Sequence, residues 1–143
     1  MSEKIVGLTV STLTGEKILF SGLSNVHCRL IFTTDRLIVQ TLSSQARQSF
    51  PEYGMDASLV NRLIDRGVES LLGDSAKNFF IPYSDVLRVE VGRRWLNPRM
   101  NVVTNDKTYR FTWFWPRHGI NEVEHIARSL FPVGIMVDKV IKI

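Results

Sequence analysis

Short runs in which apolar and polar residues alternate, separated by turn signals, recur along the chain. The run "TYRFTWFW" at 108–115 shows the pattern most strongly, because one face of an extended strand would carry four aromatic side chains. These are Tyr109, Phe111, Trp113 and Trp115. Four aromatics in phase indicate one wall of a hydrophobic core, with an aromatic binding surface as the alternative. The repeated alternation predicts a mainly β chain.

The first part of the chain is expected to form an antiparallel meander. Strand candidates rich in β-branched and apolar residues lie at 4–13, 17–24, 26–34 and 37–42. The third of them places Cys28, Leu30 and Phe32 on an apolar face, and its other face is mixed. Later strand candidates lie at 87–91 and 99–105, before the aromatic run.

The stretch "IPYSDVLRVEV" at 81–91 combines a proline, a tyrosine and a carboxylate with a strand-like second half. Pro82 donates no hydrogen bond and belongs at a strand entry or edge. Ser84 and Asp85 suit a turn, because their side chains hydrogen-bond to nearby backbone. Asp85 as a general base would need a partner that tunes its pKa. We therefore predict a strand entrance here.

Two amphipathic helices are expected. The first, at about 55–73, interrupts the strands and carries an apolar stripe that includes Leu63, Ile64, Val68 and Leu71. The second follows Gly119-Ile120, where Asn121 and Glu124 have the spacing of a capping box, and it stops at Pro132. The tail at about 133–143 is strand-like and must pair on its own sheet or with a second chain.

The length of 143 residues and the hydrophobic fraction of 44% predict a single globular domain over 1–143. No apolar run approaches the roughly 20 residues that span a bilayer. The beginning "MSEKIVGLTV" is unlike a signal peptide, and the single cysteine, Cys28, cannot close an internal disulfide. Cys28 is expected to be buried and inert. We predict a cytoplasmic location, peripheral to the inner membrane face if membranes are bound.

Positive charge is concentrated in one window of the chain. Residues 88–118 hold seven basic and two acidic residues, whereas the rest holds 11 basic and 12 acidic residues. Such a field attracts anionic partners, although half-exposed strands carry similar charges without any ligand. The candidates for an anionic ligand or a membrane are Arg93, Arg94, Trp95, Arg99 and Lys107.

Motifs for catalysis or metal binding are absent from the sequence. It has no glycine-rich phosphate loop, no His or Cys pair at metal spacing and no glycine-flanked serine nucleophile. His125 is expected to face solvent, and His118 lies in a turn where a binding role is open. We expect no enzyme activity, no cofactor and no metal.

Three stretches in order resemble the pleckstrin-homology-like superfold, within it the bacterial PH and GRAM-like group. They are "LIFTTDRLIV" at 30–39, "IPYSDVLRVEV" at 81–91 and "MNVVTNDKTYRFTWF" at 100–114. The resemblance covers about 17–131. It implies a bent antiparallel barrel of about seven strands, capped by the C-terminal helix, that binds lipid headgroups or proteins without catalysis. The chain departs from the group in its helical insert, its extra terminal strands and a loop at 22–29 with few basic residues.

Three functions are weighed in order. The first is protein interaction or scaffolding through the inserted helix or the terminal strand, which includes a homo-oligomer through that strand. The second is peripheral binding to anionic membrane lipids through Arg93, Arg94 and Arg99, with Trp95 at the interface. Nucleic-acid binding ranks third, because the aromatics of 109–115 and Arg110 fall on opposite strand faces.

Overall fold

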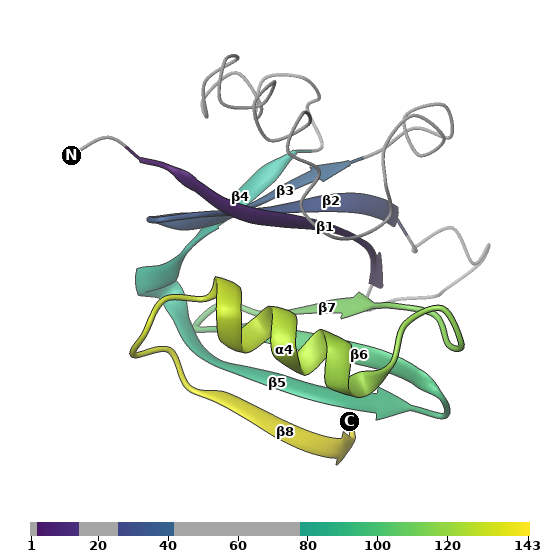
Figure 1. The fold of residues 1–143 in the computed structure, drawn as a ribbon. Coiled ribbons are helices and arrows are strands. Elements are labelled where there is room, and N and C mark those ends of the chain that lie inside the picture. The colour runs from purple at the N-terminus through teal and green to yellow at the C-terminus, as the bar shows by residue number, and fades with distance from the viewer. Residues whose placement is uncertain (1–2, 15–25, 42–77) are drawn as a thin grey trace. The chain divides into compact units, whose positions relative to one another are not determined.

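The computed structural model describes residues 3–14, 26–41 and 78–143, and these residues form a mainly β structure. Its strands are β1 (Ile5–Thr14), β2 (Val26–Thr33), β3 (Arg36–Thr41), β4 (Phe79–Pro82), β5 (Val86–Arg94), β6 (Asn97–Thr104), β7 (Thr108–Thr112) and β8 (Val137–Lys142). The helix is α4 (Ile120–Leu130), and a 3₁₀ turn, η1, spans Tyr83–Asp85. The eight strands are hydrogen-bonded in the order β4-β3-β2-β1-β7-β6-β5-β8, a mixed sheet (Figure 1). The prediction of a mainly β fold is confirmed.

Two compact units make up the chain, and β1 contributes to both. One unit comprises Met1–Ser11 and His27–Tyr83, and the other comprises Thr12–Val26 and Ser84–Ile143. The expected strand at 17–24 and the expected helix at 55–73, with Leu63, Ile64, Val68 and Leu71, lie outside the described residues. No helix within the described ranges is long and apolar enough to cross a bilayer.

The first unit is built on β2, β3 and β4. Strand β2 pairs antiparallel with β3, with Leu30 opposite Val39, and β3 pairs antiparallel with β4, with Leu37 opposite Ile81. The expected mixed face of β2 is largely buried as well, because Arg29, Ile31 and Thr33 are all buried. Cys28 is buried as predicted, and its Sγ lies 3.5 Å from the carbonyl oxygen of Ser11.

A polar cluster fastens the segment before β1 to the β2–β3 turn. Arg36 donates from Nε and Nη2 to the carboxylate of Glu3 at about 3.0 Å, and the Thr33 hydroxyl also hydrogen-bonds to that carboxylate. Arg36 in addition lies 4.6 Å from the ring centre of Phe80. Burial raises the pKa of Glu3, but the bonds from Arg36 and Thr33 outweigh it, and the net pKa is lowered.

Replacement of Glu3 by Gln is expected to destabilise the protein by about 1–3 kcal/mol at pH 7, because bonds to a charged group are lost. A carboxylate with a lowered pKa contributes stability above its ordinary value of 4.5, and this contribution is lost as the pH falls through the folded-state pKa. Urea unfolding at pH 7 and pH 3 measures the difference. Asp35→Asn, at an exposed carboxylate in the same turn, is the control. A difference between wild type and Glu3→Gln that does not shrink at low pH would contradict this assignment.

The stretch at 81–91 contains a strand end, a turn and a new strand. Pro82 is the last residue of β4, Tyr83–Asp85 form η1, and β5 begins at Val86. Pro82 therefore ends one strand and does not start the next, which corrects our placement. Asp85 lies in the turn, as expected, and the Tyr83 hydroxyl donates to the carbonyl oxygen of Thr33 at 2.8 Å.

In the second unit, β5, β6 and β7 form an antiparallel sheet. Register places Val91 opposite Met100 and Met100 opposite Phe111, and these three side chains are fully buried. Strand β7 ends at Thr112, three residues before the predicted end. Phe111 and Trp113 are buried and confirm the core wall, whereas Trp115 lies beyond the strand and is exposed.

Helix α4 packs against β5 and β6 (Figure 1). Val123 and Ala127 are buried within it, and Phe131 caps its C-terminal end. The N-cap is Gly119, without a side-chain cap, so the predicted capping box at Asn121 is wrong. The Asn121 amide oxygen instead accepts a hydrogen bond from Lys139 of β8 at 2.8 Å. His125 is exposed on the helix, as predicted.

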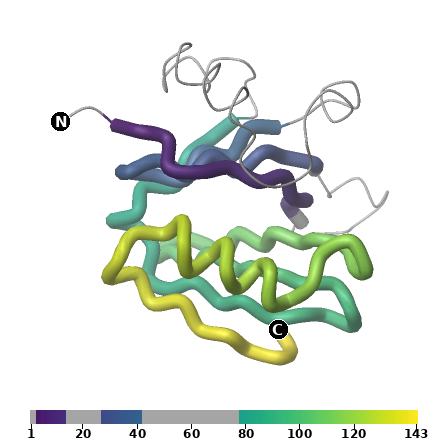
Figure 2. Tube along the Cα trace, in the orientation of Figure 1, coloured from purple at the N-terminus to yellow at the C-terminus, as the bar shows by residue number. Residues whose placement is uncertain are grey.

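Strand β8 pairs with β5 of the same chain, and it does so in parallel (Figure 2). A fully antiparallel arrangement of the described strands is therefore ruled out. The register shifts between Val91 and Arg93, where β8 comes very close to β5. A Cβ atom at Gly92 would lie 2.1 Å from the carbonyl oxygen of Val140, so only glycine fits there.

Candidate functional site

The β5–β6 turn presents a tryptophan to solvent. Trp95 and Leu96 connect the strands, with Arg94 opposite Asn97 in the register. Trp95 has a φ of 61°, a conformation that tight hairpin turns usually assign to glycine or asparagine. A bulky residue in this region costs about 1–3 kcal/mol. The sequence nevertheless places there a side chain that is 85% exposed. Asn97 and Pro98 belong to β6, so this strand begins two residues before the expected start at residue 99.

A second turn, after β7, lies beside the first. The backbone N–H of Trp115 donates to the side-chain oxygen of Asn97 at 3.1 Å, and the N–H of Trp113 donates to the carbonyl oxygen of Pro98 at 3.0 Å. The two turns together expose four large apolar side chains, which we call the apolar tip. They are Trp95 (85% exposed), Leu96 (54%), Phe114 (50%) and Trp115 (53%).

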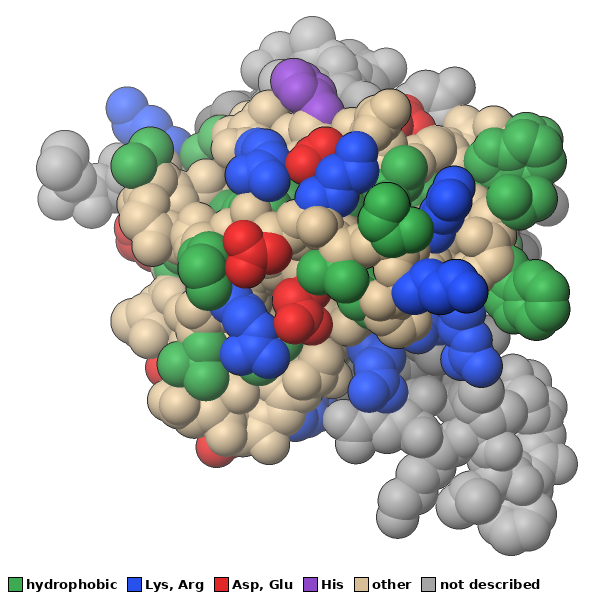
Figure 3. All heavy atoms as spheres, turned by 90° about the horizontal axis from the view of Figure 1, so that it is seen from below, with side chains coloured by type: hydrophobic (Ala, Val, Ile, Leu, Met, Phe, Trp, Pro, Cys, Tyr) green, Lys and Arg blue, Asp and Glu red, His purple; other side chains and the backbone are tan. Residues whose placement is uncertain are grey.

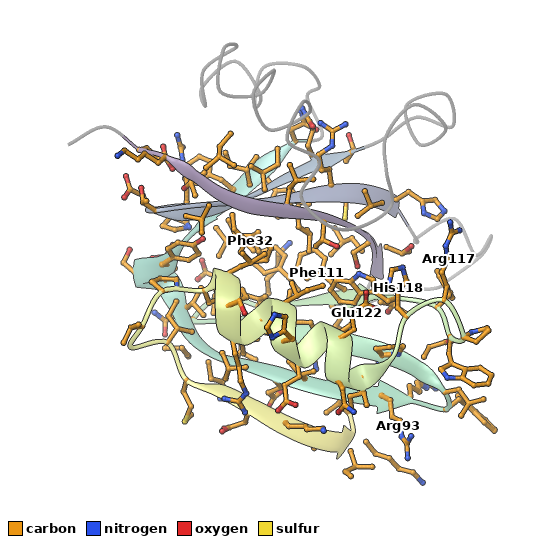
Figure 4. The ribbon with its side chains drawn as sticks, in the orientation of Figure 1. Phe32, Arg93, Phe111, Arg117, His118 and Glu122 are labelled. Atoms are coloured by element: carbon orange, nitrogen blue, oxygen red, sulfur yellow. The ribbon has the colours of Figure 1, made fainter. Side chains whose placement is uncertain are left out.

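Basic side chains adjoin the apolar tip. Arg93 and Arg94 are exposed at the end of β5, and Arg93 pairs in register with Lys142 of β8. Together with Trp95 and Ile143, these three residues line a pocket of about 260 Å³. On the face seen in Figure 3, Lys and Arg side chains gather near apolar side chains at one edge, and acidic side chains lie farther in. Figure 4 shows Arg93 pointing outward from the end of β5.

Arg99 lies on β6, directly opposite Gly92 of β5 and Thr112 of β7. Its Nε is buried without a hydrogen-bond partner in the part of the chain that the structure describes. Burial lowers the pKa of Arg99, and the positive charges of Arg94 and Arg110 lower it further. Burial and the neighbouring positive charges therefore both disfavour the charged form of Arg99.

Lys107 does not join this group. It lies in the β6–β7 turn, at the other end of β6, and its Nζ is 4.6 Å from the ring centre of Tyr109. Burial raises the pKa of Tyr109, as do the charges of Asp106 and Asp85. The structure thus groups Arg93, Arg94 and Trp95 at one end of the β5–β6 hairpin, with the charge of Arg99 close to that of Arg94, and it separates Lys107 from them.

Several residues of this surface were missed in the sequence. Leu96, Phe114 and Lys142 were not singled out, Arg110 was considered only for nucleic-acid binding, and Trp115 was assigned to the core wall. Pro116 could have indicated that the strand stops before Trp115, because it directly follows that residue. The approach of Lys142 depends on the pairing of β8 with β5, which is long-range and leaves no local signal.

His118 has a local structural role at the start of α4. It is buried, and its Nδ1 lies 2.9 Å from Oε2 of Glu122 one turn along (Figure 4). Its backbone N–H donates to the carbonyl oxygen of Phe114 at 3.0 Å, which fixes the turn that carries the exposed aromatics. Across the described ranges, no three or more His, Cys, Asp or Glu side chains gather in a way that could hold a metal ion.

Comparison with known proteins gives a likeness in fold. No protein-family model matches the sequence, and no curated protein matches it. A solved structure, the hSac2 domain from human phosphoinositide phosphatase Sac2, is similar with a TM-score of 0.57. The two chains are 9% identical, and the match covers 97% of this chain and 79% of the other. At this identity, the likeness concerns the fold alone.

Proposed function

We propose that this chain is a non-catalytic binding module that attaches to anionic membrane surfaces through the apolar tip and its neighbouring arginines. We assign it to the pleckstrin-homology-like bent barrels, with α4 as the capping helix. The antiparallel β5–β6–β7 sheet followed by a helix packed on it supports this assignment. The proposed location is the cytoplasmic face of a membrane.

The exposed Trp95 between basic residues carries the proposal. It is the first residue of the two-residue β5–β6 turn and has a positive φ, which is unfavourable for a bulky residue. Arg93 and Arg94 precede it directly. Neither arginine makes an ion pair with any residue in 3–14, 26–41 or 78–143. An indole ring suits the membrane–water interface, and apolar neighbours such as Leu96 and Trp115 add area that a bilayer can cover.

The expected energies favour a reversible, salt-sensitive attachment. Each Lys or Arg near an anionic surface contributes about 1 kcal/mol, and this contribution falls off within a Debye length. Arg93, Arg94 and Lys142 therefore supply a few kcal/mol, to which partial burial of the tip adds. The similar solved structure comes from a protein named for phosphoinositides, which supports testing anionic lipids first.

Co-sedimentation with liposomes tests the proposal. Wild type is expected to sediment with vesicles that contain phosphatidylserine and not with phosphatidylcholine alone, and to be released by high salt. Arg93→Glu/Arg94→Glu is expected to weaken binding at least tenfold, because two attractive charges become repulsive. Lys107→Glu/Arg128→Glu makes the same change in net charge away from the tip and is expected to retain most of the binding. Equal losses in both double variants would show that net charge, and not this surface, is responsible.

Protein interaction is the second candidate, and the edge strand β8 favours it. The strand order ends at β8, so within the described ranges its outer edge has no neighbouring strand. Val140 and Ile141 of β8 are exposed apolar residues. An exposed strand edge with apolar side chains is a surface on which another strand can pair. A homo-oligomer through β8 belongs to this candidate. If the wild-type protein sediments with neither kind of vesicle, the membrane proposal is rejected and protein interaction becomes the preferred function.

A further inference from the structure

Three arginines lie on one face of the β5–β6–β7 sheet. Residues directly opposite in a register share a face, and successive residues alternate. Arg94 lies opposite Asn97, Arg99 opposite Thr112, and Arg110 opposite Asn101. Residues 97, 99 and 101 of β6 alternate with Met100, so all three arginines lie on the sheet face opposite to that of Met100, a face on which Asn101 is also buried. Arg99 is the central member, between Arg94 on one side and Arg110 on the other.

The positive charge of this group has no counterpart in the described part of the chain. Among residues 3–14, 26–41 and 78–143 the buried Nε of Arg99 has no acceptor, although a buried guanidinium donor is normally hydrogen-bonded. Glu90 lies on the same face, but it accepts hydrogen bonds from Arg88 at 3.1 Å and from Asn101 at 3.5 Å. Burial has the largest effect in lowering the pKa of Arg99, and repulsion from the charges of Arg94 and Arg110 lowers it further. An anion placed between them would relieve this repulsion and supply the missing acceptor.

We infer that Arg94, Arg99 and Arg110 form a binding site for a phosphate group on the outer face of the β5–β6–β7 sheet. A guanidinium presents paired donors that match two oxygens of a phosphate, and three of them match a tetrahedral anion better than a planar carboxylate. The phosphate belongs either to a lipid headgroup or to a soluble phosphate compound. The site shares Arg94 with the membrane surface proposed above, but its other members are not part of the apolar tip, and it does not depend on the tip entering a membrane.

Titration of the full chain with pyrophosphate, followed by NMR of arginine Nε–Hε signals at constant ionic strength, tests the site. The Arg99 signal is expected to shift and saturate. Arg99→Gln and Arg110→Gln are each expected to weaken binding at least tenfold, because each removes a charged hydrogen-bond donor. Arg99→Lys keeps the positive charge but lacks the paired donors of a guanidinium, and it is expected to weaken binding less than Arg99→Gln. Thermal unfolding of each variant confirms that the fold is retained.

Arg88→Gln is the matched control, because Arg88 lies on the same face but is already paired with Glu90. It is expected to bind pyrophosphate like wild type. Saturable binding that survives in Arg99→Gln and in Arg110→Gln, or an Arg99 signal that does not respond, would overturn the inference. If phosphatidic acid vesicles compete with pyrophosphate for the site, the phosphate belongs to a lipid headgroup. If they do not compete, it belongs to a soluble compound. Trp95→Ala separates the two proposals, because it is expected to weaken vesicle attachment while pyrophosphate binding is unchanged.

Discussion

Replacing Phe111 with Ala is expected to lower the free energy of unfolding by about 3–5 kcal/mol. The ring is fully buried, and Phe111 lies on β7 with Leu13 and Met100 as its register neighbours. Truncation removes the transfer free energy of the ring and leaves a cavity that the sheet cannot fully close. The loss is large against the 5–15 kcal/mol by which domains are usually stable. Urea unfolding followed by circular dichroism measures it.

Phe114→Ala is the matched control, since the same atoms are removed three residues later. Phe114 is half exposed in the turn after β7. The expected loss is below about 1 kcal/mol, as for surface substitutions. Similar losses for the two variants would contradict the burial of one face of β7 and the end of the strand at Thr112.

Replacing Gly92 with Ser is expected to detach part of β8 and to cost about 1–3 kcal/mol. The added Cβ would lie 2.1 Å from the carbonyl oxygen of Val140 and 3.2 Å from Cγ1 of Ile143, and backbone cannot yield as a side-chain end can. Hydrogen exchange of the amides of Val137–Lys142 is expected to accelerate. Because Lys142 would leave the pocket, anionic vesicles are also expected to bind more weakly.

Gly119→Ser is the control for this substitution. A Cβ at Gly119 meets nothing within 4 Å, and serine is a favourable N-cap for α4. Its stability is expected to be unchanged or slightly higher. Unchanged exchange in β8 of the Gly92→Ser protein would show that the close approach of β5 and β8 is not required.

Local alternation predicted much of the fold correctly. Strands β1, β2, β3 and β6 and helix α4 lie close to where the two-residue and helical periods placed them. Errors arose where a boundary depended on a single residue. Pro82 suited a strand end as well as a strand start, and Trp115 continued the alternation although the hydrogen bonds of β7 had ended. The pairing partner and direction of β8 could not be predicted, because they are set by contacts distant in sequence.

The candidate site was predicted in part. The excess of basic residues at 88–118 identified Arg93, Arg94, Trp95 and Arg99. It also included Lys107, because the sequence window does not show that Lys107 lies at the opposite end of β6 from Arg93 and Arg94. The predictions at 17–24 and 55–73 fall outside the described residues, and the pleckstrin-homology-like assignment stays a prediction.

Fluorescence of Trp95 tests the membrane proposal most directly. In a Trp115→Phe protein, Trp113 is buried and Trp95 is the exposed tryptophan. Vesicles of phosphatidylserine and phosphatidylcholine with brominated acyl chains are expected to quench its emission and shift it to shorter wavelength, and high salt to reverse both. Phosphatidylcholine vesicles and a Trp95→Phe/Trp115→Phe protein are expected to give neither change. Emission from Trp95 that is unaffected by anionic vesicles would contradict the proposal that this turn enters a membrane.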